Sequence, residues 1–201
     1  VLFSSLADLS AIPICVKEQN IEKFVKIVEL IGNSFSAINL EDITAPNCFE
    51  IEKKLSTKLE IPIFHDDAHG TSIVVTAGII NALKVVGKDL DKIKIVMSGA
   101  GAAGCTIAKL LLEAGAKNLI VCDREGALAK NQNHQKSNHI EMANLTNQNM
   151  ETGSLKEVLK GADLFIGVSA PNLLDENDIK NMANDPIVFA LANPIPEIMP
   201  E

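Results

Sequence analysis

The sequence predicts an α/β protein: a doubly wound parallel sheet preceded by part of a smaller α/β domain. Short aliphatic runs alternate with helical segments along the chain, and a glycine-rich turn separates one run from the helix that follows it. Apolar residues make up 47% of the chain but aromatic residues only 3%, with no Trp and no Tyr. The core must therefore consist of Ile, Leu, Val and Ala, as is typical of buried parallel strands.

The first third of the chain alternates strand-like and helical segments. The helical segments are amphipathic, and Gly32 ends the first of them. The order is strand, helix, strand, helix, strand, with acidic residues after the second and third strands. The expected strands lie at residues 11–16, 36–40 and 61–64, and the expected helices at 21–32 and 48–59.

A mostly apolar helix over residues 70–86 is expected to lead into the second unit. We place the domains at residues 1–74 and 75–201. Residues 131–153 are polar and weakly patterned, and we expect a mobile loop with one short helix. The other expected elements are strands at 92–97, 118–123 and 187–191, a helix at 105–115, a helix followed by a strand within residues 154–171, and a helix between 173 and 185.

Charge and hydropathy narrow the possible partners. The net charge is −8, and no cluster of Lys and Arg is present, so we expect no nucleic-acid partner. The longest apolar segment, Ser72 to Gly87, is too short to span a bilayer and is interrupted by Asn81 and Lys84, so we expect no membrane span.

The N-terminus has no basic region of the kind that begins a signal peptide. The chain also does not start with Met, as expected of an internal piece of a longer protein. The four cysteines have no C-x-x-C spacing, and we expect them to be reduced in a cytoplasmic protein. They are Cys15, Cys48, Cys105 and Cys122.

A complete G-x-G-x-x-G turn occupies residues 99–104, between a predicted strand and a predicted helix. Glycines here allow a tight turn, close approach of a pyrophosphate, and close packing of helix on strand. Asp123 lies about 20 residues later, where an acid can accept the ribose hydroxyls. Together these features predict a Rossmann-like dinucleotide-binding sheet. Arg124 could meet a 2′-phosphate or be a solvated surface residue, so the choice between NAD and NADP stays open.

Two pairs of acids follow two strands: Glu41 with Asp42, and Asp66 with Asp67. Neighbouring strands would bring all four carboxylates to one sheet edge, where they repel one another unless a cation is present. Oxygen ligands of this kind suit Mg²⁺ or Mn²⁺. The alternative is that these acids cap a helix and a turn. Spacing alone favours neither the metal site nor the capping role over the other.

His65 and His69 have the spacing of a helical zinc motif. That motif needs Glu at its second position, where this chain has Asp66, and here Gly70 follows the second histidine immediately. The preceding run is strand-like, so we expect residues 65–69 to form a loop. The pattern therefore disfavours zinc.

Several long motifs resemble those of malic enzymes, in the same order and spacing, over nearly the whole chain apart from roughly residues 128–152. The short bacterial-type form is the most similar. The motifs are INLEDITAPNCFEIEKKL, IPIFHDDAHGTSIVVTAGIINALKVVGK, IVMSGAGAAG, VCDREG, GADLFIGVSAP and DPIVFALANPIPEIMPE.

The resemblance implies oxidative decarboxylation of L-malate to pyruvate with NAD or NADP and a divalent metal, Mg²⁺ or Mn²⁺, in a homodimer or larger assembly. It makes residues 1–74 part of a substrate- and metal-binding domain. It implies Glu41, Asp42 and Asp67 as metal ligands, Asp66 as the acid that orients a catalytic lysine, and Asn193 as a contact for malate and the nicotinamide end. The implied cofactor-binding residues are Thr71, Gly99, Gly101, Ala102, Ala103, Gly104, Asp123, Arg124, Ser169, Ala170 and Asn193.

The chain also departs from the family pattern. Ala68 replaces a usual glutamine, and the family's catalytic lysine and tyrosine have no counterpart in these 201 residues. We therefore expect the isolated chain to bind Mn²⁺ and, weakly, NAD(P), without turning over malate. The alternatives are a malolactic enzyme, which product analysis would distinguish, a non-catalytic dinucleotide-binding remnant, and an amino-acid dehydrogenase, which would not need the four acids.

Overall fold

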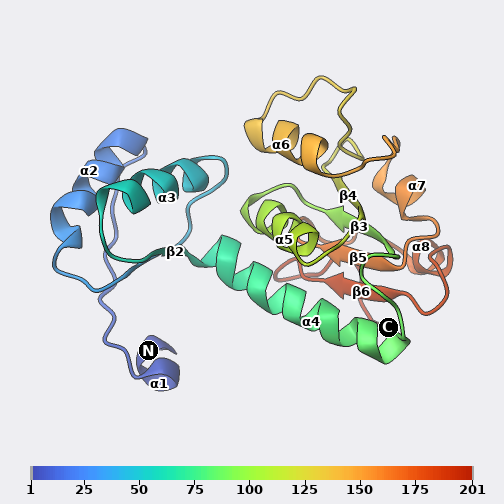
Figure 1. Cartoon of the computed structure of the whole chain (residues 1–201), viewed down its shortest axis with the longest axis horizontal. Helices are drawn as coiled ribbons and strands as arrows, with labels where there is room; N and C mark the ends of the chain where they lie inside the picture. The colour runs from blue at the N-terminus through green and yellow to red at the C-terminus, as the bar shows by residue number, and fades with distance from the viewer. Residues whose placement is uncertain (1, 201) are drawn as a thin grey trace.

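The computed structural model describes residues 2–200, which form two α/β units joined by one long helix (Figure 1). Both units contain only parallel strand pairs among these residues. The α/β class and the doubly wound parallel sheet are confirmed. In chain order the elements are α1 Leu2–Ala7, α2 Ile21–Gly32, β1 Ile38–Leu40, α3 Asn47–Lys58, β2 Ile63–His65, η1 Asp66–Gly70, α4 Thr71–Val86, β3 Lys94–Ser98, α5 Ala102–Glu113, β4 Asn118–Cys122, α6 Ser137–Leu145, α7 Leu155–Leu159, β5 Leu164–Gly167, α8 Glu176–Lys180 and β6 Ile187–Ala190.

The first unit is a two-stranded sheet, β1–β2, with α2 and α3 packed beside it. Its register pairs Leu40 with His65, so the acids that follow the two strands start at the same edge. The strand expected at residues 11–16 is wrong. This segment is extended without a strand partner, and Ile12 and Ile14 are exposed. A β-rich run becomes a strand only where another strand satisfies its backbone groups.

The second unit is a four-stranded sheet in the order β4-β3-β5-β6. Alternate residues of β3 face opposite sides: Ile95 and Met97 pack with α4 and α5, whereas Val96 packs with Phe165 and α7. Helices therefore cover both faces, as the aliphatic strands predict. The polar segment 131–153 contains one helix, α6, as expected.

The link between the units is helical from its first residue. The loop expected at residues 65–69 is wrong, because Asp66–Gly70 forms a π-helical turn, η1, that continues directly into α4. η1 packs against α5, and this contact supports a helical turn where the polar sequence favours a loop. Our proposed boundary between residues 74 and 75 falls inside α4.

The joined helix, Asp66–Val86, is 21 residues long and contains an 18-residue window with a mean hydropathy of 1.3, so by length and composition alone it could cross a membrane. The segment 72–87 covers only part of this helix, and the greater length of the helix does not overturn the expectation of no membrane span. A single such helix is weak evidence, since core helices of soluble proteins pass the same test. Val75, Ile79 and Leu83 on one face of α4 are buried in the core of the second unit. The opposite face exposes Ile73, Val74, Ile80 and Val85.

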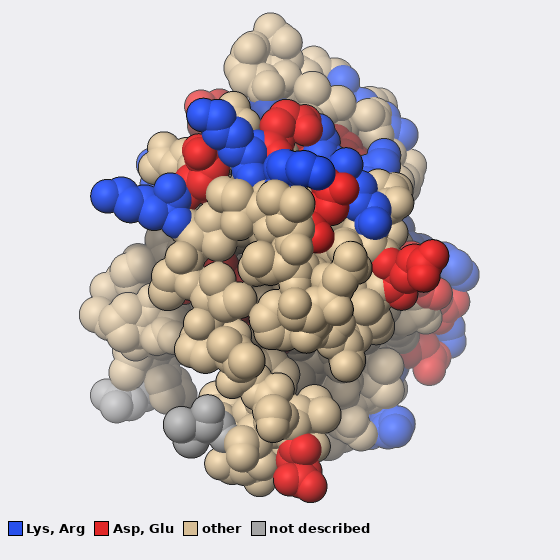
Figure 2. All heavy atoms as spheres, turned by 90° about the vertical axis from the view of Figure 1, so that its left-hand side faces the viewer, with Lys and Arg blue, Asp and Glu red and all other residues tan. Residues whose placement is uncertain are grey.

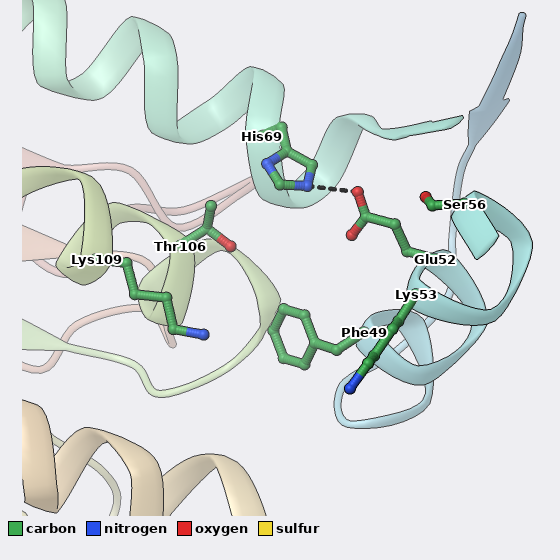
Figure 3. Close-up of a pocket in the computed structure, with 7 residues that line it drawn as sticks. All are labelled: Phe49, Glu52, Lys53, Ser56, His69, Thr106 and Lys109. Atoms are coloured by element: carbon green, nitrogen blue, oxygen red, sulfur yellow. Dashed lines mark hydrogen bonds and ion pairs between the residues drawn. The ribbon is translucent and has the colours of Figure 1, made fainter. Parts of the chain in front are cut away.

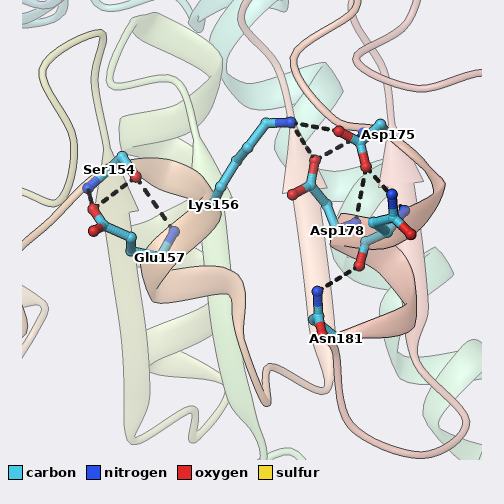
Figure 4. A network of polar contacts seen from close by, with 7 residues as sticks. Ser154, Lys156, Glu157, Asp175, Asp178 and Asn181 are labelled. Carbon is cyan, nitrogen blue, oxygen red and sulfur yellow. Dashed lines mark hydrogen bonds and ion pairs between the residues drawn. The ribbon is translucent and has the colours of Figure 1, made fainter.

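Two five-residue helices near the C-terminus begin with capping boxes (Figure 4). Ser154 and Glu157 cap α7 reciprocally, and Asp175 and Asp178 do the same for α8. Lys156 Nζ joins the two helices, lying 2.8 Å from an Asp175 carboxylate oxygen and 2.6 Å from one of Asp178. Helices this short leave most of their backbone groups unpaired, so the caps determine where they begin.

Charged side chains at the α2–α3 end gather in one band in which both signs alternate (Figure 2). Lys58 lies 3.3 Å from Glu29, and Lys54 contacts both Glu22 and Glu50. A band of mixed sign has no continuous positive field of the kind that attracts a phosphate backbone. This face therefore lacks the electrostatic character of a nucleic-acid site.

The cysteine environments predict thiol reactivity. Cys15 is exposed, whereas Cys48, Cys105 and Cys122 are buried, and burial raises the pKa of Cys105 to about 11 and that of Cys122 to about 12. At pH 8 we expect one thiol of the native chain to react rapidly with Ellman's reagent, and all four to react after denaturation. Cys15→Ser should remove the rapid phase. Two or more rapid thiols would contradict the buried placement.

Candidate functional site

The four acids lie together at the carboxyl ends of β1 and β2, as their spacing predicts. The backbone N–H of Asp42 donates to Asp67 Oδ2 at 3.0 Å. Asn39 Nδ2 donates to Glu41 Oε1 at 2.7 Å. Partial burial raises the pKa of Glu41, and repulsion from the Asp66 and Asp67 carboxylates raises it further. The cluster therefore carries electrostatic strain that a bound cation would relieve.

Asp42 reaches Asp67 from an unusual backbone conformation. Its φ is +57°, in the left-handed region that Asp adopts more readily than most residues. The residue in this conformation is the one whose N–H donates to the Asp67 carboxylate after β2. Strained backbone of this kind is concentrated at functional sites.

The two histidines that suggested a zinc motif have different partners. His65 is buried at the end of β2, and its Nε2 lies 3.9 Å from Asp67 Oδ2 with no hydrogen bond. His69 Nε2 lies 2.6 Å from Glu52 Oε1 of α3. The π turn thus directs His69 toward α3, while His65 stays next to the acids.

The chemistry of the acid cluster fits the divalent metal implied by the resemblance. Carboxylate oxygens are the donors that Mg²⁺ and Mn²⁺ prefer, and repulsion from the Asp66 and Asp67 carboxylates adds to the effect of burial in raising the pKa of Glu41. Within residues 2–200, however, no three His, Cys, Asp or Glu side chains are grouped closely enough to hold a metal in this conformation. The ligand assignment of Glu41, Asp42 and Asp67 remains a proposal.

An open cavity of about 330 Å³ lies between α3, η1 and α5 (Figure 3). Lys109 Nζ of α5 is 5.7 Å from the centroid of the Phe49 ring of α3, and His69 contacts Glu52 beside it. No motif of the sequence indicates this cavity. Its α3 residues recur at helical spacing, so they share one face of that helix, and this is the sequence signal that could have indicated it. Its lining residues are Phe49, Glu52, Lys53, Ser56, His69, Thr106 and Lys109.

The glycine turn has the geometry that its motif predicts. It follows β3, and Gly101 is the N-cap of α5. Gly99 has a φ of +118°, which side chains disfavour. A Cβ added at Gly104 would lie 1.9 Å from the Gly99 carbonyl oxygen, whereas one at Gly101 would meet no heavy atom within 4 Å. Gly104 is therefore required for packing, and Gly101 leaves open space beside the start of α5.

Helix α6 contributes two residues near the turn that the sequence analysis missed. Asn138 is buried, and its Nδ2 donates to the carbonyl of Ala100 at 2.5 Å. His139 Nδ1 lies 3.2 Å from Asp123 Oδ2, the carboxylate expected to accept ribose hydroxyls. Both lie in the polar segment that departs from the family motifs, so no motif indicated them. Only the folding of α6 back over β4 and α5 reveals their position.

The remaining candidate residues lie on the loops after β4, β5 and β6 and at the start of α4. Ser169 Oγ, after β5, lies 2.8 Å from Ser98 Oγ at the end of β3. Ala170 follows Ser169, Asn193 follows β6, and Arg124 is exposed after β4. Thr71 begins α4. Ligands of open α/β sheets bind at this carboxyl edge, and the sheet brings these separate loops to it.

Two family models match the chain: the malic enzyme N-terminal domain over residues 2–56 and the malic enzyme NAD binding domain over residues 68–199. The chain belongs to the malic enzyme family. The second unit is therefore the Rossmann-like NAD-binding domain of that family.

Individual relatives agree with the family models. The chain is 52% identical over 201 residues to the NAD-dependent malic enzyme of Geobacillus stearothermophilus, a match that covers 100% of this chain and 42% of that protein. It is 48% identical over 202 residues to the bifunctional malic/malolactic enzyme of Bacillus subtilis, covering 100% of this chain and 49% of that protein. The chain thus spans about half the length of these curated relatives.

A solved structure is also similar throughout. The NAD-dependent malic enzyme of Thermotoga maritima matches with a TM-score of 0.96 and 47% sequence identity, over 99% of this chain and 53% of that chain. The arrangement of both units is therefore that of the malic enzyme family.

Two substitutions should distinguish the role of Gly104 in packing from the role of Gly101 in letting the dinucleotide approach the backbone. We expect Gly104→Ala to destabilise the fold, because its Cβ would meet the Gly99 carbonyl oxygen at 1.9 Å. Gly101→Ala should keep the thermal midpoint within a few degrees but weaken NADH binding by about tenfold, since the pyrophosphate approaches this backbone. Circular dichroism melting and NADH fluorescence titration measure the two effects. Unchanged NADH affinity in Gly101→Ala would count against this site.

The partly buried position of His139 predicts a pH dependence of stability. Burial lowers the pKa of His139, and the Asp123 carboxylate opposes this only in part. With a folded-state pKa below the unfolded value, His139 should contribute stability above about pH 6.5 that is lost as the pH falls. Urea unfolding at pH 7.5 and pH 5.5 should therefore show a larger loss for the wild type than for His139→Gln. An equal loss in both proteins would refute this assignment.

Proposed function

We propose that this chain carries the metal-binding and dinucleotide-binding part of a malic enzyme, which oxidises L-malate with NAD or NADP and decarboxylates the oxaloacetate formed to pyruvate and CO₂. The family membership and the acid cluster support the proposal. We also propose that the protein acts as a cytoplasmic homodimer or larger assembly, as the family resemblance implies.

The observation that carries the proposal is the packing of η1 on α5. η1 begins with Asp66 and Asp67, and α5 begins at the glycine turn. This contact brings the carboxylates of the first unit next to the proposed cofactor site of the second. A malate held by a metal on these acids would therefore lie beside a dinucleotide, as hydride transfer between them requires.

We assign roles to the described residues on this basis. Glu41, Asp42 and Asp67 would hold the divalent metal, which when bound acts as a Lewis acid on the malate oxygens. Asp66 would orient the catalytic lysine, and Asn193 would contact malate and the nicotinamide end. The backbone N–H groups at the start of α5 suit the pyrophosphate, because the helix dipole favours negative charge there.

The metal site can be tested with Asp67→Asn. Its amide oxygen can still accept the hydrogen bond from the Asp42 N–H, but the negative charge is lost. We expect Mn²⁺ to bind the wild type, and to bind the variant at least tenfold more weakly, because the set of ligands loses one full negative charge. Isothermal titration calorimetry with MnCl₂ measures both affinities.

Asp89→Asn is the matched control, because Asp89 is an acid paired with Lys92 on the surface, outside the proposed site. It should bind Mn²⁺ as the wild type does. A second titration with L-malate should show binding only when Mn²⁺ is present. Equal Mn²⁺ affinity in Asp67→Asn and wild type would remove the proposed metal site, and malate binding without the metal would contradict the proposed substrate site.

A further inference from the structure

Glu197 is a buried acid that the roles above do not use. Its residue is 0% exposed, although it belongs to the proline-rich segment near the C-terminus. The Ser169 N–H donates to its Oε1 at 2.8 Å, and the Ala192 N–H donates to its Oε2 at 3.1 Å. The Ser169 hydroxyl lies 3.4 Å from Oε1. Both carboxyl oxygens thus accept hydrogen bonds, the pattern of an ionised carboxylate.

The fold makes room for this carboxylate. A Cβ added at Gly167, the last residue of β5, would lie 2.3 Å from the Glu197 carboxyl carbon and 2.4 Å from one of its oxygens. The backbone of the segment is also anchored, since the Leu174 N–H donates to the Glu197 carbonyl at 3.1 Å. The ion pairs among residues 2–200 include no cationic partner for Glu197. Buried negative charge is costly without such a partner, so its placement calls for a functional explanation.

Glu197 accepts hydrogen bonds from the loops after β5 and β6, and Ser169 links the first of these loops to the end of β3. Ser169 follows β5 and contacts both Glu197 and Ser98, the last residue of β3. Ala192 follows β6 and directly precedes Asn193. One carboxylate therefore sets the positions of the loop after β5 and the loop after β6, next to the glycine turn after β3. Ligands of open α/β sheets bind across these loops.

We propose that Glu197 is a positioning residue for the dinucleotide and that its negative charge favours the oxidised over the reduced nicotinamide. This inference rests on the proposed function, in which Ser169 and Asn193 lie along the cofactor. The oxidised ring carries one positive charge that the reduced ring lacks. The fixed Glu197 carboxylate behind the loops attracts the positive charge of the oxidised ring through a medium of low dielectric constant. It has no comparable attraction for the neutral reduced ring.

Two variants separate charge from positioning. Glu197→Gln keeps the size and removes the charge, so we expect the ratio of the Kd for NAD⁺ to the Kd for NADH to rise by about tenfold. Ser169→Ala keeps the charge and removes the hydroxyl that joins Ser98 to Glu197. It should weaken NAD⁺ and NADH binding by similar factors of about three or more, and leave the ratio unchanged.

The experiment uses the whole 201-residue chain. NADH is titrated by fluorescence and NAD⁺ by calorimetry, with circular dichroism melting of each protein in parallel. Glu176→Gln, an exposed acid of α8 with a side chain 79% exposed, is the matched control and should keep both affinities. A folded Glu197→Gln protein with the wild-type ratio would overturn the role of the charge.

The outcomes distinguish this inference from the proposed function. If the wild type binds neither NAD⁺ nor NADH, the proposed function fails. If the wild type binds both and Ser169→Ala binds both equally well, the positioning role is overturned. If Glu197→Gln is unfolded, Glu197→Asp replaces it. The retained charge should keep the ratio of the Kd for NAD⁺ to the Kd for NADH, while the shorter side chain should weaken both affinities at least threefold. Unchanged affinities would overturn the proposal.

Discussion

The packing of η1 and α4 against the second unit is the constraint on which the arrangement of the candidate site depends. The helix begins with Asp66 and Asp67 of the four-acid cluster and buries Val75, Ile79 and Leu83 in the core of the dinucleotide-binding sheet. Because a helix is stiff over this length, burial of its apolar face determines where its polar N-terminal end lies. Hydrophobic packing in one unit thereby positions charged groups of the other.

Charge is concentrated at two sites on these units, and each is compensated differently. At the ends of β1 and β2 four carboxylates lie together, and the pKa of Glu41 is raised, first by its partial burial and then by repulsion from Asp66 and Asp67. At the ends of β5 and β6, Glu197 is fully buried but accepts hydrogen bonds from backbone N–H groups. The first site suits an added cation, whereas the second is already satisfied and is suited to holding loops in place.

Much of the fold could be predicted from the sequence, because aliphatic runs, helical periodicity and a glycine turn are local signals. The helix ending at Gly32 and the strand before the turn are confirmed. The strand expected at residues 11–16 failed because no partner strand lies beside it. The loop expected at residues 65–69 failed because packing on α5 favours a helical turn over the local polar composition.

By itself the sequence determined the α/β class, the acids that follow two strands, and the glycine turn, since each is encoded by neighbouring residues. Only the tertiary structure decided that Asn138 holds the Ala100 carbonyl, that His139 contacts Asp123, and that Glu197 joins the loops after β5 and β6. Asn138 and Ala100, for example, are 38 positions apart in the chain. Such pairs have no local pattern, and the packing of helices and strands alone brings them within hydrogen-bond distance.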